Sequence, residues 1–234
     1  RKMRLSEAFR KLYLKEDGSF YRFGEIQKNQ EIADLLENIA EQGVDYFYKG
    51  KVAKQIVDLI NDRGGCFDVS DMESYEPKFR EPVKTTYRGY EVAAFAPPSG
   101  GCALVEMLNI LENYDVRSMG HNTAASIHAL TESMKLGFAD RSVALGDPDF
   151  VNVDVERLTS KKFAHERFTL AGEKAGEFAS ADGIEAKQYP GNTSHFVVMD
   201  KDGNAFSQTQ TIRDWFGCGI VVDGLGFVLN NAMS

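Results

Sequence analysis

A threonine at the start of a strand-like segment is the residue of this chain best placed to do chemistry. Thr193 follows a flexible Pro-Gly-Asn approach and opens the alternating run 193–200. A threonine hydroxyl is a weak nucleophile until a base lies beside it. Cutting the chain in front of the threonine supplies that base, because it frees the residue's own α-amino group. The pattern therefore indicates Thr193 as a nucleophile and the bond between Asn192 and Thr193 as a site of self-cleavage.

Two alternating runs separated by a turn are expected to hold this threonine in place. The runs are residues 194–200 and 205–211. Alternation on both sides of an Asp-Gly turn is typical of a hairpin. A two-residue loop competes with a three-residue loop, in which Gly203 is left-handed and Asp200 pairs with Asn204. We favour the three-residue loop because of where it places the threonine.

The choice of loop decides which residue faces Thr193 across the hairpin. The two-residue loop places Ile212 opposite Thr193, whereas the three-residue loop places Thr211 there, so that one hydroxyl faces another. A cross-strand pair of threonines by itself contributes only about 0.2–1 kcal/mol. Thr209 presents the next hydroxyl on the same face and is a second candidate, for contact with a substrate.

The histidines are not expected to act as the catalytic base or as metal ligands. His195 lies two residues beyond Thr193 on the same strand, roughly 7 Å away, which is too far for direct proton transfer. We interpret it as a packing and orienting residue. His128 and Glu132 are spaced to share one helix face, but no third metal ligand accompanies them. We expect a surface pair there, and neither a metal nor a cofactor.

Composition limits the classes of partner. The chain has 234 residues and a net charge of −8, which argues against nucleic acid and against anionic membrane surfaces. It has no apolar run of about 18 residues, the length of a membrane span. The opening Arg1-Lys2-Met3-Arg4 is not followed by the apolar core of a signal peptide. The three cysteines, Cys66, Cys102 and Cys218, are widely spaced, and we expect buried free thiols.

Periodicity predicts a mixture of helices and strands. Helices are expected at 26–42, 51–62, 102–113 and 123–144, with a short capped helix at 70–73. Further strands are expected at 90–95, 219–223 and 226–229. The long helix is expected to bury Ile127, Leu130, Met134 and Phe138. Residues 171–190 are poor in large apolar side chains and are interpreted as a solvated linker that delivers the scissile bond.

Eight ordered segments resemble the γ-glutamyltransferases. They are Tyr46-Phe47-Tyr48-Lys49-Gly50, Tyr87-Arg88-Gly89-Tyr90-Glu91-Val92, Pro97-Pro98-Ser99-Gly100-Gly101, Met107-Leu108-Asn109-Ile110-Leu111-Glu112, Ala139-Asp140-Arg141, Leu145-Gly146-Asp147-Pro148-Asp149-Phe150, Thr193-Ser194-His195 and Asp200-Lys201-Asp202-Gly203-Asn204. The resemblance covers almost the whole chain. The chain resembles an interior piece of such an enzyme, without either end.

The resemblance implies an N-terminal-nucleophile hydrolase with an α+β fold, a four-layer αββα sandwich, of which this chain would be part. It implies a precursor that splits itself, so that residues 1–192 end a large subunit and 193–234 begin a small one, within one structural domain. The reaction implied is cleavage of γ-glutamyl amides such as glutathione through an acyl-enzyme, with water, an amino acid or a peptide as acceptor. It also suggests an exported protein.

The same resemblance implies roles for individual residues. Thr211 matches the threonine that hydrogen-bonds the nucleophile and tunes it. Arg213 and Ala232 stand where the family has Asn and Gln residues that hold the substrate's α-amino group. A cation at Arg213 would repel an α-ammonium unless Asp214 neutralises it. We therefore expect that the acyl group accepted can carry an acid instead.

Three functions follow from these observations. The first is an autoprocessing γ-glutamyltransferase or hydrolase. The second is an acylase of the same fold that acts on glutaryl-type amides, similar to the cephalosporin acylases. The third is a non-catalytic relative that keeps the fold and leaves the junction before Thr193 uncut.

Overall fold

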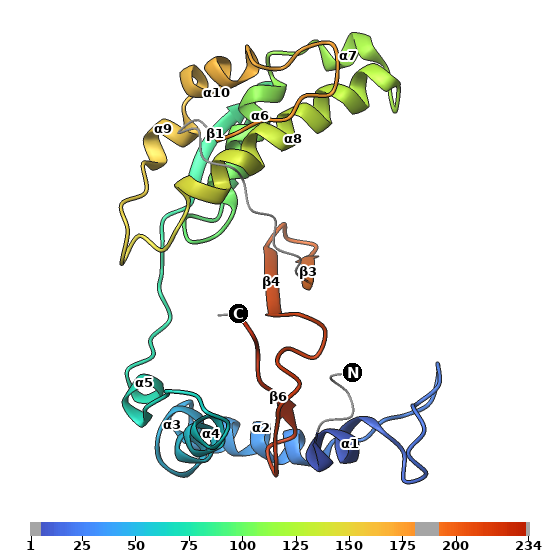
Figure 1. The fold of residues 1–234 in the computed structure, drawn as a ribbon, viewed down its shortest axis with the longest axis vertical. Coiled ribbons are helices and arrows are strands. Elements are labelled where there is room, and N and C mark those ends of the chain that lie inside the picture. The colour runs from blue at the N-terminus through green and yellow to red at the C-terminus, as the bar shows by residue number, and fades with distance from the viewer. Residues whose placement is uncertain (1–5, 181–191, 233–234) are drawn as a thin grey trace. The chain divides into compact units, whose positions relative to one another are not determined.

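The computed structural model describes residues 6–180 and 192–232, which belong to two compact units (Figure 1). The unit that carries Thr193 is built from residues 1–77 and 190–234, and the second unit from residues 78–189. Each unit has a hydrophobic core of its own.

The unit that carries Thr193 combines short helices with two small antiparallel sheets. Its helices are α1 Glu7–Tyr13, α2 Gln30–Gln42, α3 Asp45–Tyr48, α4 Gly50–Asp62 and α5 Val69–Glu73. Its strands are β3 Asn192–Met199, β4 Ala205–Arg213, β5 Val221–Val222 and β6 Phe227–Val228. The core joins helices α2, α4 and α5 to the β5–β6 hairpin through Leu35, Val52, Ala53, Ile56, Val57, Met72, Val222 and Leu225. Burying these apolar side chains stabilises the helices and the β5–β6 hairpin, which follows the β3–β4 hairpin in the chain.

Capping residues set the ends of the helices in this unit. Helix α2 begins four residues later than expected, because the side chain of Asn29 accepts the backbone N–H of Ile32 and caps the helix there. Gly43 ends it with a φ of 83°, in the left-handed region that favours glycine. Helix α5 has the expected capping box, but Asp68 and Asp71 form it in place of Ser70 and Glu73.

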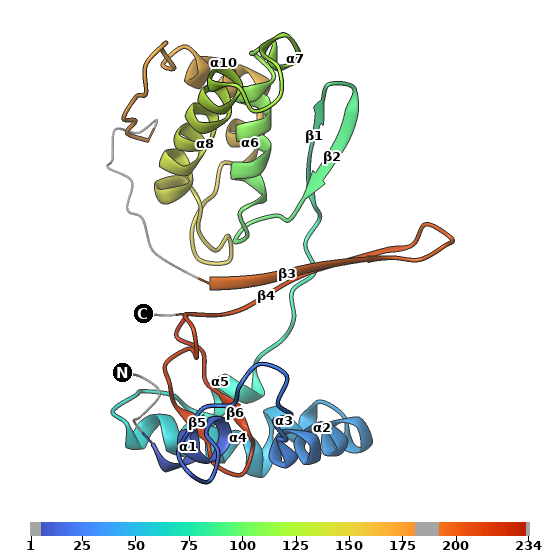
Figure 2. The same cartoon turned by 90° about the vertical axis from the view of Figure 1, so that its right-hand side faces the viewer.

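The second unit packs helices against a two-stranded sheet (Figure 2). Its elements are β1 Val83–Tyr87, β2 Tyr90–Ala94, α6 Gly101–Leu111, α7 Val116–Met119, α8 Ala124–Ala144, α9 Val155–Thr159 and α10 Lys161–Phe168. Strand β1 is polar along its outer side, which is why its sequence does not predict a strand. It pairs antiparallel with β2, and Val83 joins Cys102, Val105, Leu158 and Phe163 in a buried cluster.

Helix α8 has the predicted length but buries a different face. The apolar stripe expected to be buried, Ile127, Leu130, Met134 and Phe138, is 41–53% exposed in the described structure. Gly137 instead lies on the buried face of the helix and packs against α6. A Cβ added at Gly137 would lie 2.6 Å from Cγ of Met107, so the two helices approach too closely for a larger side chain. Close backbone packing therefore decides the buried face of this helix, and the prediction was wrong.

The expected linker is docked along α8 and α10 in its first half. The carbonyl of Gly172 is 2.8 Å from Nε2 of His128, and the N–H of Gly176 donates to Oε2 of buried Glu132 over 2.9 Å. Phe178 packs on the cluster of Ile110, Leu136 and Ala164. Residues 172–180 are therefore a docked strap, not a solvated linker, and His128 and Glu132 hold it rather than forming a free surface pair. Residues 181–190 of the expected linker lie outside the described residues.

Three ionisable side chains, Arg167, Asp140 and Glu106, are buried in this unit. Nε of Arg167 is 2.7 Å from Oδ2 of Asp140, and its Nη2 donates to the carbonyl of Ala179 over 2.8 Å. Burial, together with a hydrogen bond to Asp140 and the charge of that carboxylate, raises the pKa of Glu106 to about 9. Glu106 is therefore protonated at neutral pH, which avoids placing two buried carboxylates side by side.

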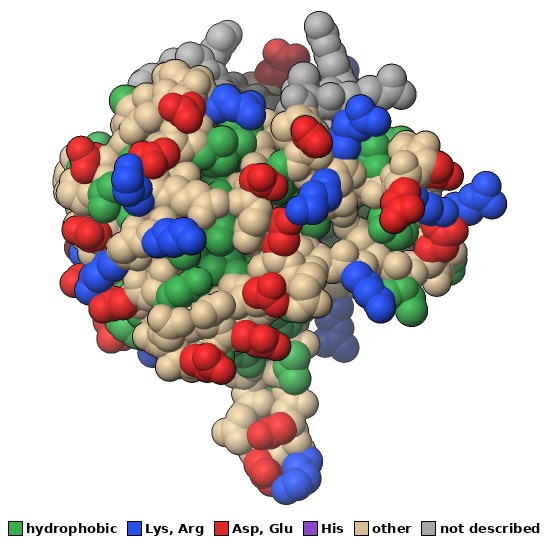
Figure 3. All heavy atoms as spheres, turned by 90° about the horizontal axis from the view of Figure 1, so that it is seen from below, with side chains coloured by type: hydrophobic (Ala, Val, Ile, Leu, Met, Phe, Trp, Pro, Cys, Tyr) green, Lys and Arg blue, Asp and Glu red, His purple; other side chains and the backbone are tan. Residues whose placement is uncertain are grey.

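The surface carries both signs of charge. On the face seen in Figure 3, Lys and Arg side chains are interspersed with Asp and Glu side chains.

All three cysteines are free, but only Cys102 is buried, whereas Cys66 is exposed. In the described ranges, no helix combines the length and the apolar character that crossing a bilayer requires.

Candidate active site

The hairpin β3–β4 has the predicted three-residue loop. The N–H of Asp200 donates to the carbonyl of Asn204 over 3.0 Å, and Gly203 has a φ of 86°. The ladder continues from Met199 opposite Ala205 with one constant register toward the start of β3. The turn residues thus fix which side chains face one another along most of the hairpin.

The register shifts at Thr193 itself. Ser194 pairs with Gln210, but Asn192 pairs with Arg213, so Thr193 faces both Thr211 and Ile212. Such a bulge, with two residues opposite one, reorients side chains and is frequent beside active sites. The expected pairing of Thr193 with Thr211 is therefore replaced by a bulge that includes both threonines.

The hydroxyl of Thr211 contacts the peptide bond that is expected to break. Its Oγ1 donates to the carbonyl oxygen of Asn192 over 2.6 Å and accepts the backbone N–H of Arg213 over 2.8 Å. The resemblance implies that Thr211 bonds the nucleophile. In the structure, its hydroxyl instead bonds the carbonyl of the residue that precedes Thr193. A donor at this oxygen stabilises the negative charge that develops there during attack.

Thr193 is exposed and lines a cavity of about 430 Å³. The cavity is formed by the start of β3, the end of β4 and the loop that follows, through Asn192, Thr193, Ser194, Gln210, Thr211, Ile212, Asp214, Trp215 and Phe216. The expected nucleophile, the expected junction and Thr211 thus share one site that is open to a small molecule.

Two further hydroxyls of the hairpin, those of Thr209 and Ser207, contact His195. Its Nδ1 is 2.7 Å from Oγ1 of Thr209, and its Nε2 is 3.2 Å from Oγ of Ser207. His195 thereby bridges two residues of β4, which agrees with an orienting role. Thr209 contacts this histidine, and the cavity beside Thr193 is lined by other residues.

Arg213 and Ala232, the two residues expected to alter specificity, contact each other. Nη1 of Arg213 donates to the carbonyl of Ala232 over 3.2 Å. Next to it, Asp214 accepts from Nδ2 of Asn231 over 2.9 Å, while the N–H of Asp214 donates to Oδ1 of Asn231 over 3.1 Å. Asp214 lines the cavity at Thr193, whereas Arg213 and Ala232 are not among its lining residues.

The loop after β4 has an unusual backbone. Arg213 and Phe216 have φ values of 72° and 60°, a region that non-glycine residues rarely adopt. The ring of Phe216 is held by Phe9 and Tyr13, at centroid distances of 5.4 and 5.0 Å. Between the two strained residues, Trp215 is 74% exposed on the cavity wall. Sequence reasoning did not single out Trp215, and its only signal was a large aromatic residue directly after a strand.

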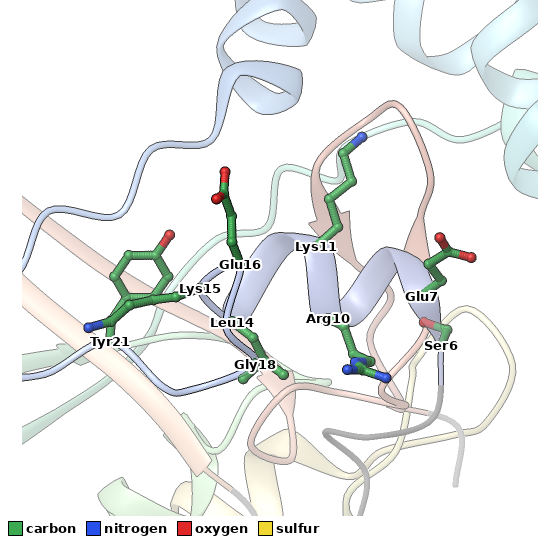
Figure 4. A pocket seen from close by; sticks show the side chains of 9 residues that line it. All are labelled: Ser6, Glu7, Arg10, Lys11, Leu14, Lys15, Glu16, Gly18 and Tyr21. Atoms are coloured by element: carbon green, nitrogen blue, oxygen red, sulfur yellow. The ribbon is translucent and has the colours of Figure 1, made fainter.

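A larger open cavity of about 790 Å³ lies on helix α1 and the chain after it (Figure 4). It is lined by Ser6, Glu7, Arg10, Lys11, Leu14, Lys15, Glu16, Gly18 and Tyr21. Lys11 pairs with Glu31, and Lys15 pairs with Glu25 at 2.7 Å, so two of its cations are already neutralised. It has no lining residue in common with the cavity at Thr193. In the part of the chain that the structure describes, no three His, Cys, Asp or Glu side chains gather as metal ligands.

The chain is similar to known proteins over most of its length. A family model described as gamma-glutamyltranspeptidase matches residues 1–234. The chain is 39% identical over 224 residues to the glutathione hydrolase proenzyme of Escherichia coli, covering 93% of this chain and 38% of that protein. It is 40% identical over 202 residues to the acylase ACY 1 proenzyme of a Pseudomonas strain, SE83, covering 86% of this chain and 36% of that protein.

The structural likeness points the same way. The crystal structure of cephalosporin acylase from Bacillus halodurans matches with a TM-score of 0.79 and 31% identity, covering 92% of this chain and 38% of that one. The chain thus spans less than two-fifths of the length of these relatives. The likeness confirms the expected fold class, a partial α+β fold of the N-terminal-nucleophile hydrolases, and the family match confirms the resemblance seen in the sequence. The chain belongs to the gamma-glutamyltranspeptidase family.

Proposed function

We propose that the complete protein carrying this chain is an autoprocessing γ-glutamyltransferase or hydrolase whose nucleophile is Thr193. The observation that carries this proposal is the hydrogen bond from Thr211 to the carbonyl of Asn192, at the edge of a cavity that Thr193 lines. Self-cleavage would divide one precursor into a large subunit ending at Asn192 and a small subunit beginning at Thr193.

Self-cleavage uses the hydroxyl of Thr193 on its own chain. Oγ of Thr193 attacks the carbonyl carbon of Asn192, and the developing negative charge on the carbonyl oxygen is stabilised by the hydroxyl of Thr211. The C–N bond then breaks, the hydroxyl proton ends on the released α-nitrogen, and an ester joins the two residues. Water hydrolyses the ester, which yields a carboxylate on Asn192 and a free hydroxyl and amine on Thr193.

Catalysis would reuse the same hydroxyl with the new amine as its base. An α-amino group has an ordinary pKa of about 7.7–8.0, so it accepts a proton near neutral pH. Oγ of Thr193 attacks the γ-amide carbonyl of the substrate, the amine portion leaves with a proton, and the acyl group stays on the hydroxyl. Water, an amino acid or a peptide amine then takes the acyl group and restores Thr193.

The wall of the cavity supports a γ-glutamyl donor such as glutathione. Asp214 lines the same cavity as Thr193, and a carboxylate there attracts the α-ammonium of a γ-glutamyl group. The relative from Escherichia coli is named a glutathione hydrolase proenzyme. On this proposal, the partners are a small γ-glutamyl substrate, an acceptor, and the two subunits of one precursor.

A second candidate is an acylase that accepts glutaryl-type amides. Arg213 and Ala232 stand where the resemblance implies Asn and Gln, and the contact between them places a guanidinium near both positions. A cation there favours an acyl group that ends in a carboxylate. The relative that is named acylase ACY 1 proenzyme is as similar to this chain as the hydrolase.

Turnover of two anilides by the complete protein tests both candidates. We expect p-nitroaniline release from γ-glutamyl-p-nitroanilide by the unaltered protein and none by the Thr193→Ala variant. A higher kcat/KM for glutaryl-p-nitroanilide would favour the acylase, and a strong preference for the γ-glutamyl compound would refute it. Equal activity of the Thr193→Ala variant would contradict both.

A further inference from the structure

The side chain of Trp215 projects from the wall of the cavity at Thr193 without being buried. It is 74% exposed, yet it lines the same cavity as Thr193 and Thr211. Indole is among the largest apolar surfaces a side chain can bury, and leaving it exposed forgoes that stabilisation. An exposed indole beside reacting groups is therefore available to contact a bound molecule.

The backbone around Trp215 is held in a costly conformation. The left-handed φ values of Arg213 and Phe216 are unfavourable for residues that carry a Cβ. Such strain persists only where neighbouring contacts over-determine it. Here the contacts are the bond from Arg213 N–H to Thr211, the paired bonds of Asp214 with Asn231, and the ring contacts of Phe216. The loop thus presents Trp215 in a fixed position.

The proposed chemistry limits which part of a substrate can use this ring. The acyl portion, γ-glutamyl or glutaryl, is a flexible chain with a charged end and offers no flat apolar surface. The amine portion is the part of the substrate that varies from one amide to another. A fixed indole stacks on flat aromatic groups, and such contacts contribute about 0.5–1.5 kcal/mol beyond simple burial.

We propose that Trp215 determines specificity for the leaving amine, and that it favours amides of flat aromatic or heterocyclic amines over amides of small aliphatic amines. This inference rests on the proposed function, because it takes Thr193 as the nucleophile. It adds a residue on the amine side of the substrate, whereas Arg213 and Asp214 concern the acyl side.

The test compares two donors that carry the same acyl group. One is a p-nitroanilide and the other is the corresponding amide of glycine, each in the acyl series that the unaltered, complete protein turns over faster. Both give the same acyl-enzyme, so a difference in kcat/KM reports the step in which the amine is still bound. We expect Trp215→Ala to lower the ratio of kcat/KM for the anilide to that for the glycine amide by about fivefold, and Trp215→Phe to recover most of this loss.

Each outcome decides the proposal. An unchanged ratio of kcat/KM for the two donors would overturn the proposal. That is the result expected if Trp215 has a purely structural role, if it contacts the acyl group, or if another part of the complete protein covers it. Failure of the unaltered protein to turn over either donor would contradict the proposed function itself. The two failures are therefore distinguishable.

Discussion

The hydroxyl of Thr211 donates a 2.6 Å hydrogen bond to the carbonyl oxygen of Asn192, the residue immediately before Thr193. The same hydroxyl oxygen accepts the N–H of Arg213. This second bond orients the hydroxyl proton of Thr211 toward the Asn192 carbonyl. This relationship spans the bulge at the end of the hairpin, and on the proposed function it places Thr211 beside the bond that is cut.

Removing this donor is expected to slow self-cleavage. Loss of one donor to a developing oxyanion typically costs about 100-fold or more in rate, so we expect Thr211→Ala to cleave about 100-fold more slowly. Thr211→Ser keeps the hydroxyl and should remain within about tenfold of the unaltered rate. The rate is measured from the conversion of freshly made complete precursor into two chains on denaturing gels.

Thr209→Ala is the matched control for this experiment. Thr209 lies on the same strand, but its hydroxyl is 2.7 Å from His195 and away from the junction. Its removal should leave the rate of self-cleavage nearly unchanged. Equal slowing by the Thr209 and Thr211 variants would mean that the hairpin, and not the hydroxyl on the Asn192 carbonyl, controls the rate.

The buried carboxyl of Glu106 predicts a loss of stability at alkaline pH. Its pKa is raised to about 9 by burial and by Asp140, so the folded protein holds this proton more tightly than the unfolded chain. The stabilisation is complete below the unfolded value near 4.3 and is lost as the pH rises toward 9, by an amount on the order of a few kcal/mol. The free energy of unfolding, measured in urea at pH 5, 7 and 9, should therefore fall.

Glu106→Gln should flatten this pH dependence, because an amide keeps a donor for Asp140 and cannot lose a proton. Glu156→Gln, at an exposed position of α9, serves as the control and should retain the slope of the unaltered protein. A Glu106→Gln variant with the same slope as the unaltered protein would show that another group is responsible.

The strap 172–180 is expected to depend on Glu132. Burial opposes ionisation of this carboxyl, but hydrogen bonds from Lys135 and from the N–H of Gly176 outweigh burial and lower its pKa. Removing a charged acceptor from a buried bond costs about 1.5–3 kcal/mol. We therefore expect Glu132→Ala to increase the rate of tryptic cleavage after exposed Lys174 about tenfold. Thr131→Ala, exposed on the same helix, should not change it, and equal rates in all three proteins would rule out this anchor.

The turn chemistry made much of the hairpin predictable. Asp200 and Gly203 select the three-residue loop from local preferences alone, and the register follows from the loop. Helix α8 was predictable in extent, because Thr123 caps its start. Its buried face was not predictable, because Gly137 packs against α6, a helix distant in sequence, and the periodicity of α8 alone does not reveal this contact. The strap likewise depends on a buried partner, Glu132, that its own polar sequence does not reveal.

The candidate residues of the site come from the sequence, but the bonds between them do not. Thr193 and Thr211 follow from spacing and resemblance, and both line the cavity. The bulge beside Thr211 occurs together with a left-handed Arg213, a conformation that no rule for turns predicts at an arginine. The exposure of Trp215 depends on the same strained loop, which is held from α1 through Phe216.

The intact mass of the complete, purified protein tests the central claim most directly. We predict two chains that separate between Asn192 and Thr193, the smaller one beginning with Thr193, and a single uncut chain for the Thr193→Ala variant. An active protein whose mass shows one continuous chain through that bond would contradict the account.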